Sequence, residues 1–315
     1  MSKILSVASY APHKVLTNDD LSKMVDTNDE WIVQRTGIKR RHVVSDGETN
    51  LDIATRAAQE ALDKSGLNKE DIDAILFATI TPDLFTPSMA CQLKRRLDID
   101  RKNLLAFDIN AACSGFVVAM ETAHHLLHSY KNILVVASDT MSRIIDWTDR
   151  GTCILFGDGA GAVVLTQSEH TPKFHSFSEH DITDSLKTNS IYEDKTTLSM
   201  KGTDVFKFAV NALTTCIRKE LEDNNMTIEQ VDYIVAHQAN VRIISLASKQ
   251  LGIREDKFYM NIQEYGNTSS ASVPLVLAEM VEKKMIHQGQ NVLFVAFGSG
   301  LTYSSCLWKI EGEIK

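Results

Sequence analysis

The chain has 315 residues, of which 43% are hydrophobic and 23% charged, as in ordinary globular proteins. Its formal net charge of -8 gives no electrostatic footprint for nucleic acid. No run approaches the roughly 20 apolar residues that span a bilayer, and the first residues lack the apolar segment of a signal peptide. We therefore expect a cytoplasmic protein of one large or two medium domains that binds neither nucleic acid nor membranes.

The elements predicted in the first half of the chain alternate between helices and buried strands. Residues 51–65 carry an apolar stripe at helical spacing and are followed by Gly66, a typical helix stop. Residues 74–79, 104–109 and 133–137 are short apolar runs that suit strands buried on both faces. This alternation predicts layered sheets covered by helices.

The second half of the chain repeats the first. Residues 71–78 match 230–237, and residues 132–139 match 291–298, each pair at an offset of 159 residues. A helical pattern over 205–224 continues the resemblance between the halves. A repeat this long predicts two domain-sized α/β units, residues 1–166 and 167–315, packed about a pseudo-twofold axis. Sites then gather at the carboxyl ends of the strands, where the units meet.

The five cysteines lie far apart and include no CxxC pair: Cys91, Cys113, Cys153, Cys216 and Cys306. Such a set predicts neither a disulfide framework nor a zinc site. Cys113 differs from the others because it lies in Asn110-Ala-Ala-Cys-Ser-Gly-Phe116, between a predicted strand and a predicted helix. A helix start favours an anion, so we expect a lowered thiol pKa and a nucleophile. The alternative is a small core residue where the helix packs closely on the strand.

Two polar residues of the second half are further candidates. His237 ends the buried run 233–236, and the repeat places it at the sheet edge where ligands collect. The alternative is a structural histidine. Asn267 lies in the small polar segment 265–274 before an apolar helix. It suits either a capping residue in a turn or an amide that donates a hydrogen bond to a substrate carbonyl.

Two glycine-rich segments remain. Residues 297–301, Phe-Gly-Ser-Gly-Leu, follow a strand and suit either a hairpin turn or a backbone N–H that binds an oxyanion. Residues 156–161, Phe-Gly-Asp-Gly-Ala-Gly, precede a strand rather than follow one. They are therefore not a dinucleotide-binding fingerprint, and we interpret them as structural.

Taken together, these segments resemble the β-ketoacyl-[acyl-carrier-protein] synthase III family of condensing enzymes over essentially the whole chain. The segments that carry the resemblance are 25–38, 110–116, 149–152, 156–161, 237–240 and 266–274. The resemblance implies an α/β thiolase-like fold with two similar halves in a five-layered α-β-α-β-α arrangement, and a homodimer. The rivals are a related polyketide condensing enzyme, a thioester hydrolase with a Cys-His-Asn triad, and a non-catalytic acyl-binding protein.

The resemblance implies a catalytic triad of Cys113, His237 and Asn267. Cys113 would take an acyl group from acyl-CoA and condense it with malonyl-[acyl-carrier protein] as CO2 leaves, giving a 3-oxoacyl-[acyl-carrier protein]. The backbone N–H groups of Cys113 and Ser299 would hold the oxyanion. Many relatives have Gly at position 299, but only a backbone N–H is needed there. No metal or redox cofactor is implied, since both acyl donors are substrates.

The resemblance also implies binding residues. Those assigned to the CoA tunnel are Thr27, Trp31, Arg35, Arg150, Gly202 and Asn240, with Trp31 and Arg150 sandwiching the adenine. Those assigned to carrier-protein docking are Lys207, Gln238 and Arg242. Without the family, such residues would suggest only packing or a solvated face. Thr86 stands where many relatives carry a Phe that caps the partner subunit's acyl pocket, so our hypothesis is a roomier pocket.

Overall fold

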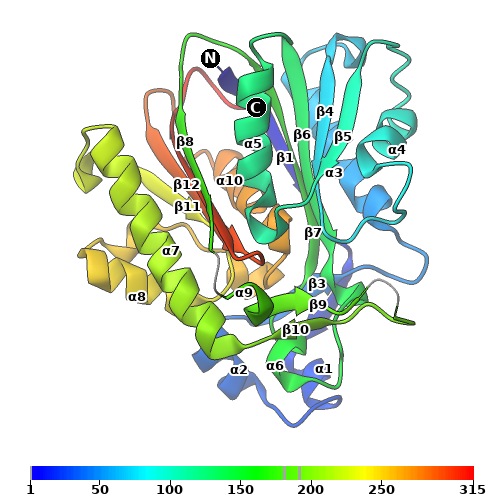
Figure 1. Ribbon diagram of the computed structural model, residues 1–315, viewed down its shortest axis with the longest axis vertical. Coiled ribbons are helices and arrows are strands. Elements are labelled where there is room, and N and C mark those ends of the chain that lie inside the picture. Colours follow the sequence, from blue (N-terminus) through cyan, green and yellow to red (C-terminus); the bar gives the residue numbers. More distant parts are fainter. Residues whose placement is uncertain (1, 180–181, 191–192) are drawn as a thin grey trace.

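Two β-sheets form the frame of the protein in this computed structural model, which describes residues 2–179, 182–190 and 193–315 (Figure 1). The first sheet has the strand order β1-β7-β6-β4-β5, in which β4 runs parallel to both β5 and β6. Its strands are β1 (Ser2–Tyr10), β4 (Ala74–Ala78), β5 (Leu105–Ile109), β6 (Asn132–Thr140) and β7 (Asp158–Gln167).

The second sheet has the order β11-β12-β13-β8 and repeats the pairing of the first. Its strands are β8 (Lys173–Ser178), β11 (Tyr233–Ala236), β12 (Asn291–Gly298) and β13 (Thr302–Lys309). Ala74 pairs with Ile133 in the first sheet, and Tyr233 pairs with Val292 in the second, so the partners keep the offset of 159 residues. The counterpart of β5 is reduced to one parallel bridge at Phe258. The domain boundary at residue 166 stays a prediction.

Helices cover both sheets and fill the space between them. They are α1 (Asn18–Ser22), α2 (Asp29–Thr36), α3 (Asn50–Ser65), α4 (Met89–Arg96), α5 (Gly115–Leu126), α6 (Arg150–Cys153), α7 (Gly202–Asp223), α8 (Val241–Leu251), α9 (Ile262–Tyr265) and α10 (Ser272–Glu282). Helices α3 and α4 pack on the first sheet, α5 and α10 lie between the sheets, and α7, backed by α8, packs on the second. This is the predicted five-layered arrangement.

The helix ends follow from local sequence. Helix α3 begins with a capping box between Thr49 and Asp52 and ends at Gly66, which has a φ of +74°. The predicted helix therefore matches α3 to within one residue. Helix α7 begins at Gly202, three residues before the predicted start at Val205. No side chain caps this start, so the sequence carried no signal for it.

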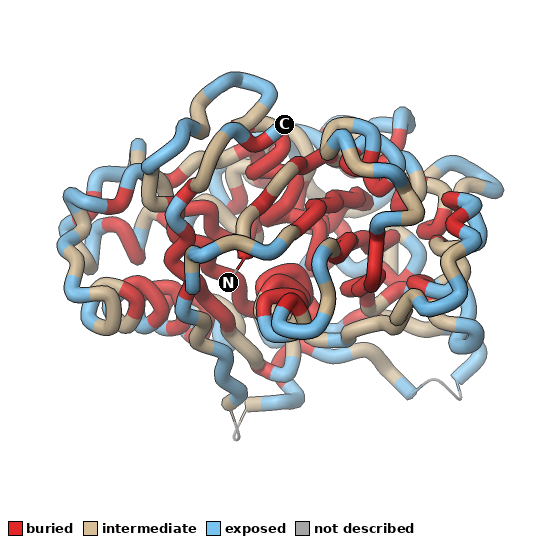
Figure 2. The backbone as a smooth tube through the Cα atoms, turned by 90° about the horizontal axis from the view of Figure 1, so that it is seen from above, coloured by how far each residue is buried: buried red, intermediate tan, exposed pale blue. Residues whose placement is uncertain are grey.

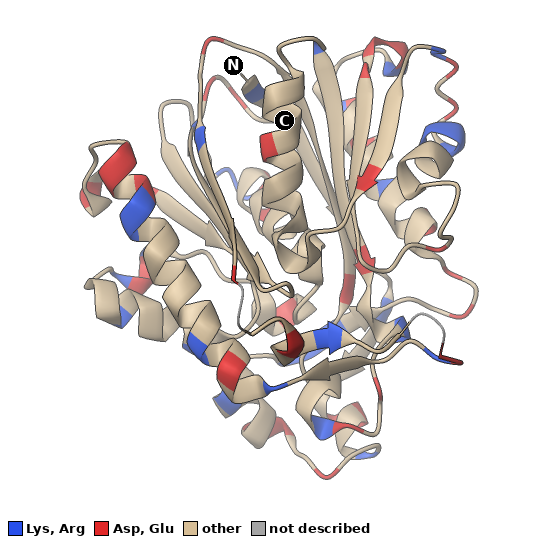
Figure 3. Cartoon of the chain, viewed as in Figure 1, with Lys and Arg blue, Asp and Glu red and all other residues tan. Residues whose placement is uncertain are grey.

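The core of the described residues consists of three apolar clusters that lie between successive layers. One apolar cluster joins both sheets through α5 and α10, and two others lie beneath the outer helices. Figure 2 shows the buried residues in the interior and the exposed ones at the periphery. Most charged residues lie near the ends of helices and strands or in loops (Figure 3). The short pairs β2–β3 (Lys14–Thr17 with Arg40–Val43) and β9–β10 (Leu186–Thr188 with Leu198–Met200) lie at one end, near α1, α2 and α6 (Figure 1).

Candidate active site

Cys113 lies in a single 3-10 turn, Ala112–Ser114, between β5 and α5. Ala112 opens the turn with a φ of +46°, a conformation that costs a non-glycine residue about 1 kcal/mol. The Ser114 hydroxyl donates to the carbonyl of Ala111 at 2.6 Å and lies 2.8 Å from the Thr302 hydroxyl on β13. The turn is therefore fixed to both sheets, and the predicted position at a strand-to-helix turn is confirmed.

The prediction that the Cys113 thiol has a lowered pKa is wrong for this structure. Burial, together with a smaller contribution from the negative charge of Asp139, raises the pKa of Cys113 to about 12. The Ser269 hydroxyl, 3.5 Å from the sulfur, acts in the opposite direction but does not outweigh burial. Only 5% of the residue is exposed, so loss of hydration dominates over the nearby helix start.

His237 follows β11 and is held on three sides. Its backbone N–H donates to Val295 on β12 at 2.8 Å, and its ring packs edge-on against Phe297. Its Nδ1 lies 2.6 Å from the Ser272 hydroxyl at the start of α10. Burial lowers the pKa of His237 to about 3, so the ring is neutral near pH 7.

Asn267 is held by backbone bonds across the two halves. Its N–H donates to Leu155 at 2.8 Å, and its carbonyl accepts from Gly157 at 3.0 Å. Its side-chain Oδ1 accepts from the Ser269 N–H at 2.9 Å, which leaves the amide NH2 to donate elsewhere. Glycine is required at 157, because a Cβ there would lie 2.3 Å from the Tyr265 carbonyl. The glycine-rich segment is thus structural, as predicted, and also supports Asn267.

The buried Arg41 supports the same region. Its guanidinium donates to the carbonyls of Ile154 and Leu16 and to the side chain of Asn18. Burial lowers the pKa of Arg41 to about 10. Its bond to Ile154 fixes the chain one residue before the segment that pairs with Asn267.

Cys113, His237 and Asn267 line one cavity of about 90 Å³, together with Gly202 and Asn240. Apolar side chains make up most of the remaining wall: Leu155, Phe156, Leu186, Met200, Val205, Phe206, Phe208, Ala239, Ile243, Phe297 and Leu301. Among the described residues that line it, none is a Lys, Arg, Asp or Glu. The cavity therefore suits an uncharged chain that ends at the sulfur.

The β12–β13 turn lies directly against Cys113. A Cβ on Gly298 would lie 2.7 Å from the Cys113 backbone nitrogen and 2.8 Å from its Cβ, so only glycine allows this approach. Ser299 follows and uses its hydroxyl to bind the Leu186 carbonyl. The predicted hairpin turn is confirmed, and binding of an oxyanion by a backbone N–H of this segment stays a prediction.

The residues assigned to CoA lie on α2 or just before it, on α6 and in the cavity wall. The guanidiniums of Arg35 and Arg150 lie 4.5 and 4.9 Å from the centre of the Trp31 ring. The Thr27 hydroxyl is buried without a hydrogen-bond partner. Asn240 caps α8 through its side chain.

The carrier-docking and acyl-pocket residues are more scattered. Lys207 and Arg242 are exposed, and the Arg242 guanidinium lies over Phe206, a residue of the cavity wall. Gln238 is only 1% exposed, and its amide bonds the carbonyl of Ala236, so its assignment to docking is wrong. Thr86 lies on an exposed loop and not in the cavity wall.

Sequence reasoning missed three residues that contact the triad: Ser269, Ser272 and Phe297. Ser269 and Ser272 lie within the recognised segment 266–274, but two further hydroxyl residues there, Thr268 and Ser270, look equivalent in sequence. Within the described chain, no group of three or more His, Cys, Asp or Glu side chains is arranged to hold a metal ion. No described helix is long and apolar enough to cross a membrane.

Comparisons with known proteins place this geometry in a family. Residues 107–184 match the model for 3-oxoacyl-[acyl-carrier-protein] synthase III, and residues 221–310 match its C-terminal model. The β-ketoacyl-[acyl-carrier-protein] synthase III of Clostridium beijerinckii is 44% identical over 97% of this chain and 98% of its own.

Solved structures agree with the sequence matches. The 3-oxoacyl-[acyl-carrier-protein] synthase III of Aquifex aeolicus VF5 is 42% identical with a TM-score of 0.92, over 98% of this chain and 99% of its own. That of Pseudomonas aeruginosa PAO1 is 34% identical with a TM-score of 0.93, over 100% and 99%. The chain therefore belongs to the β-ketoacyl-[acyl-carrier-protein] synthase III family.

Proposed function

We propose that this protein catalyses the initiating condensation of fatty acid synthesis. It transfers an acyl group from acyl-CoA to Cys113 and condenses it with malonyl-[acyl-carrier protein], with loss of CO2. The observation that carries this proposal is the convergence of Cys113, His237 and Asn267 on one uncharged cavity. A thiol nucleophile and two hydrogen-bond donors are what a decarboxylative condensation requires.

The first step forms a thioester on Cys113. The sulfur attacks the acyl-CoA carbonyl, the bond to the CoA sulfur breaks, and the thiol proton leaves with CoA. Backbone N–H groups of Cys113 and Ser299 bind the oxyanion of the tetrahedral intermediate. The buried site disfavours a thiolate but accepts a neutral thioester, because apolar side chains surround it.

The second step forms the carbon–carbon bond. Malonyl-[acyl-carrier protein] places its thioester carbonyl between the His237 Nε2 and the Asn267 amide, which donate hydrogen bonds. Since no described lining residue carries a positive charge, the malonyl carboxylate finds no ion-pair partner and leaves as CO2. The enolate carbon then attacks the carbonyl of the Cys113 thioester, the bond from sulfur to the acyl group breaks, and the 3-oxoacyl product leaves as the sulfur takes up a proton from solvent. Neither a metal nor a redox cofactor enters these steps.

Mass spectrometry and a condensation assay test the proposal. Incubation with acetyl-CoA should add one acetyl group at Cys113, and malonyl-[acyl-carrier protein] should then discharge it as 3-oxobutanoyl product. Cys113→Ala should lose acylation, whereas Asn267→Ala should keep acylation and lose decarboxylation. Release of free acid would indicate a thioester hydrolase, and no adduct would indicate an acyl-binding protein. Equal turnover of malonyl-CoA in place of the carrier-bound substrate would favour a polyketide-type enzyme.

The CoA nucleotide binds beside Trp31 in this proposal. An intercalated base needs about 7 Å between its two stacking partners. Arg150 lies 4.9 Å from the Trp31 ring and donates to the carbonyl of Asp26, so adenine must displace it. Trp31 fluorescence should therefore change on CoA binding, and Arg150→Ala should weaken binding of CoA more than of a pantetheine thioester. An equal loss for both would contradict the adenine site.

The carrier protein docks at the exposed starts of α7 and α8 in this proposal. Lys207 and Arg242 are exposed cations beside the cavity wall, where an acidic partner would meet them. Arg242→Glu should raise KM for malonyl-[acyl-carrier protein] and leave acyl transfer from CoA intact. Lys249→Glu, the same charge change on the last turn of α8, is the matched control. Equal loss of both half-reactions in Arg242→Glu would refute docking here.

A homodimer completes the proposal, and the edge strand β5 supports it. Leu105 and Ile109 bond toward β4, so the backbone groups of Ala106 and Asp108 face away from the sheet. Every residue of β5 is only half-buried. An antiparallel pair of β5 strands would join two first sheets and cover this edge. Ala106→Pro removes one outward N–H and should shift sedimentation toward the monomer; an unchanged dimer would exclude this interface.

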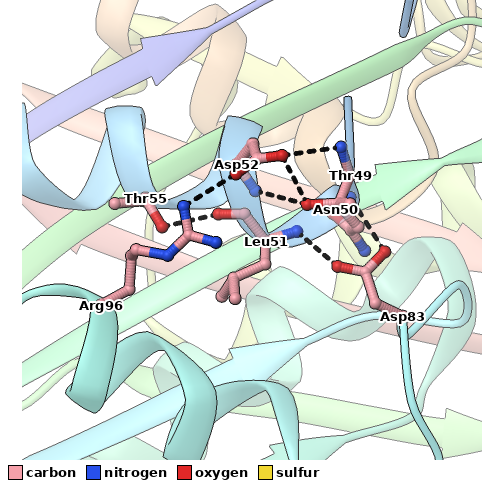
Figure 4. Close-up of polar contacts among 7 residues, drawn as sticks. All are labelled: Thr49, Asn50, Leu51, Asp52, Thr55, Asp83 and Arg96. Atoms are coloured by element: carbon pink, nitrogen blue, oxygen red, sulfur yellow. Dashed lines mark hydrogen bonds and ion pairs between the residues drawn. The ribbon is translucent and has the colours of Figure 1, made fainter. Parts of the chain in front are cut away.

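The loop that carries Thr86 would contact the second copy. Leu84 and Phe85 are 51% and 83% exposed at its tip. Asp83 anchors the loop, because its carboxylate accepts from the backbone N–H groups of Asn50 and Leu51 at the start of α3 (Figure 4). Thr86 would then leave room in the partner's acyl pocket. Thr86→Phe should lower kcat/KM for longer primers relative to acetyl-CoA, by about 1 kcal/mol per methylene; unchanged ratios would remove Thr86 from primer selection.

We also propose that the protein works in the cytoplasm. All five cysteines are free thiols, and four of them are buried. Unpaired cysteines are typical of a reducing compartment. Fractionation of the source cells with an antibody against the chain would test this, and recovery outside the cytoplasm would contradict it.

A further inference from the structure

Ser272 contacts His237 from behind, on the side away from the cavity. Its hydroxyl lies 2.6 Å from the ring Nδ1, and Ser272 itself is not part of the cavity wall. The residue is 2% exposed and begins α10, yet its side chain does not cap that helix. The hydroxyl is therefore directed at the β11 side of the site rather than at its own helix.

The hydrogen-bond directions at this hydroxyl can be assigned. The backbone N–H of Gln238 lies 3.4 Å from the Ser272 Oγ, and a backbone N–H can only donate. The oxygen accepts there, and its own proton remains to be donated. The only other described partner is the His237 Nδ1 at 2.6 Å, so Nδ1 is the acceptor.

A neutral imidazole carries one proton, so an accepting Nδ1 places that proton on Nε2. We infer that Ser272 is a positioning residue that fixes the Nε2–H tautomer of His237 and so makes the ring a hydrogen-bond donor toward the cavity. Phe297 packs edge-on against the ring at 5.2 Å and restricts its rotation. The inference rests on the proposed function, in which His237 stabilises the malonyl enolate.

This tautomer has a consequence for the two half-reactions. An Nε2 that already carries a proton cannot accept one from Cys113, so His237 serves the decarboxylation step and not the acylation step. Loss of the Ser272 hydroxyl should therefore slow the two steps unequally. A neutral hydrogen bond that biases the tautomer corresponds to about a tenfold effect on the step that needs it.

The test combines nitrogen NMR with separated kinetics. The full-length protein is labelled with 15N-histidine, and the His237 signals are assigned as those missing from His237→Gln. In the parent protein these signals should show a protonated Nε2. Ser272→Ala should mix the tautomers and lower kcat for malonyl-[acyl-carrier protein] decarboxylation about tenfold. KM for that substrate and acylation of Cys113 should stay within about threefold, and Ser272→Thr should restore both the NMR signature and the rate.

Ser248→Ala is the matched control, since it removes another buried hydroxyl bond, which runs from Ser248 on α8 to the Ile253 carbonyl. It should keep the parental tautomer and rates. An unchanged Nε2–H signature in Ser272→Ala would overturn the inference, even if Ser272→Thr does not fold. Equal slowing of both half-reactions would also overturn it, because that is the effect of a structural residue. If the parent protein does not condense at all, the proposed function fails while the NMR result still decides the tautomer.

Discussion

Gly298→Ala is the sharpest test of how the two halves share the active site. The added methyl carbon would lie 2.7, 2.8 and 3.1 Å from the N, Cβ and Cα atoms of Cys113. These atoms belong to the backbone and the base of the side chain, so no rotamer change relieves the overlap. Strand β12 and the nucleophile turn must therefore separate by about 0.5–1 Å to reach ordinary contact distances. Such a shift moves the Cys113 N–H away from the oxyanion position.

The expected cost is larger for catalysis than for folding. A misplacement of about 1 Å at a reacting centre lowers the rate about 100-fold, whereas overpacking of this kind costs about 1–3 kcal/mol of stability. The assay is kcat/KM for primer-dependent condensation, with thermal unfolding measured on the same samples. Gly289→Ala is the control, because no atom lies within 4 Å of its added carbon. Its φ of +90° disfavours alanine, so this variant tests backbone strain without steric overlap. A folded Gly298→Ala enzyme within threefold of the parent would refute the reasoning.

Three further predictions follow from buried charged and titratable groups. The fold lowers the pKa of His237 from 6.5 to about 3, so the unfolded chain binds the proton more readily than the folded one. As the pH is lowered from 6.5 to 3, the free energy of unfolding should therefore decrease by up to about 1.4 kcal/mol per pH unit. Urea unfolding of the parent and His237→Asn checks this, and equal slopes would contradict it. Burial raises the pKa of Cys113 to about 12, so the rate of its alkylation by iodoacetamide should rise about tenfold per pH unit between pH 7 and 10. A rate that levels off near pH 8 would contradict this prediction. Arg41→Met should cost about 2–4 kcal/mol in urea unfolding, because three buried oxygen acceptors lose their donor; a neutral effect would show that these bonds are weak.

The parts of the fold that could be predicted are those set by local pattern. The buried apolar runs at 74–79 and 133–137 gave β4 and β6, and Gly66 gave the end of α3. The repeat was visible because an unbroken offset links both strand pairs, and the structure keeps the same offset in their hydrogen-bonded register. Periodicity and turn chemistry act over a few residues, so a sequence displays them directly.

The properties of the site that were predicted wrongly depend on contacts between distant segments. The sequence shows Cys113 beside a helix start, but it does not show that the fold buries the sulfur and places the charge of Asp139 near it. Gln238 follows His237 and looks like a surface amide. Its amide instead bonds Ala236 and accepts from the backbone of Asn261, which brings it inside. Burial of a polar residue follows from its partners and not from its own chemical type.

The duplication also explains why Cys113, which we propose as the nucleophile, and the proposed donors His237 and Asn267 come from different halves. Ala112 and Ser269 each have a positive φ, and each opens a 3-10 turn that leads into a central helix, α5 or α10. The second residue of one turn is Cys113, which faces the cavity; its counterpart is Ser270, whose hydroxyl donates to the buried Asp139 at 2.6 Å. The two turns contact each other. One copy of a strained turn therefore presents the Cys113 sulfur to the cavity. The other copy follows Asn267 and is bonded to the first sheet through Asp139. Relative motion of the halves would therefore separate the proposed nucleophile from its proposed amide donor.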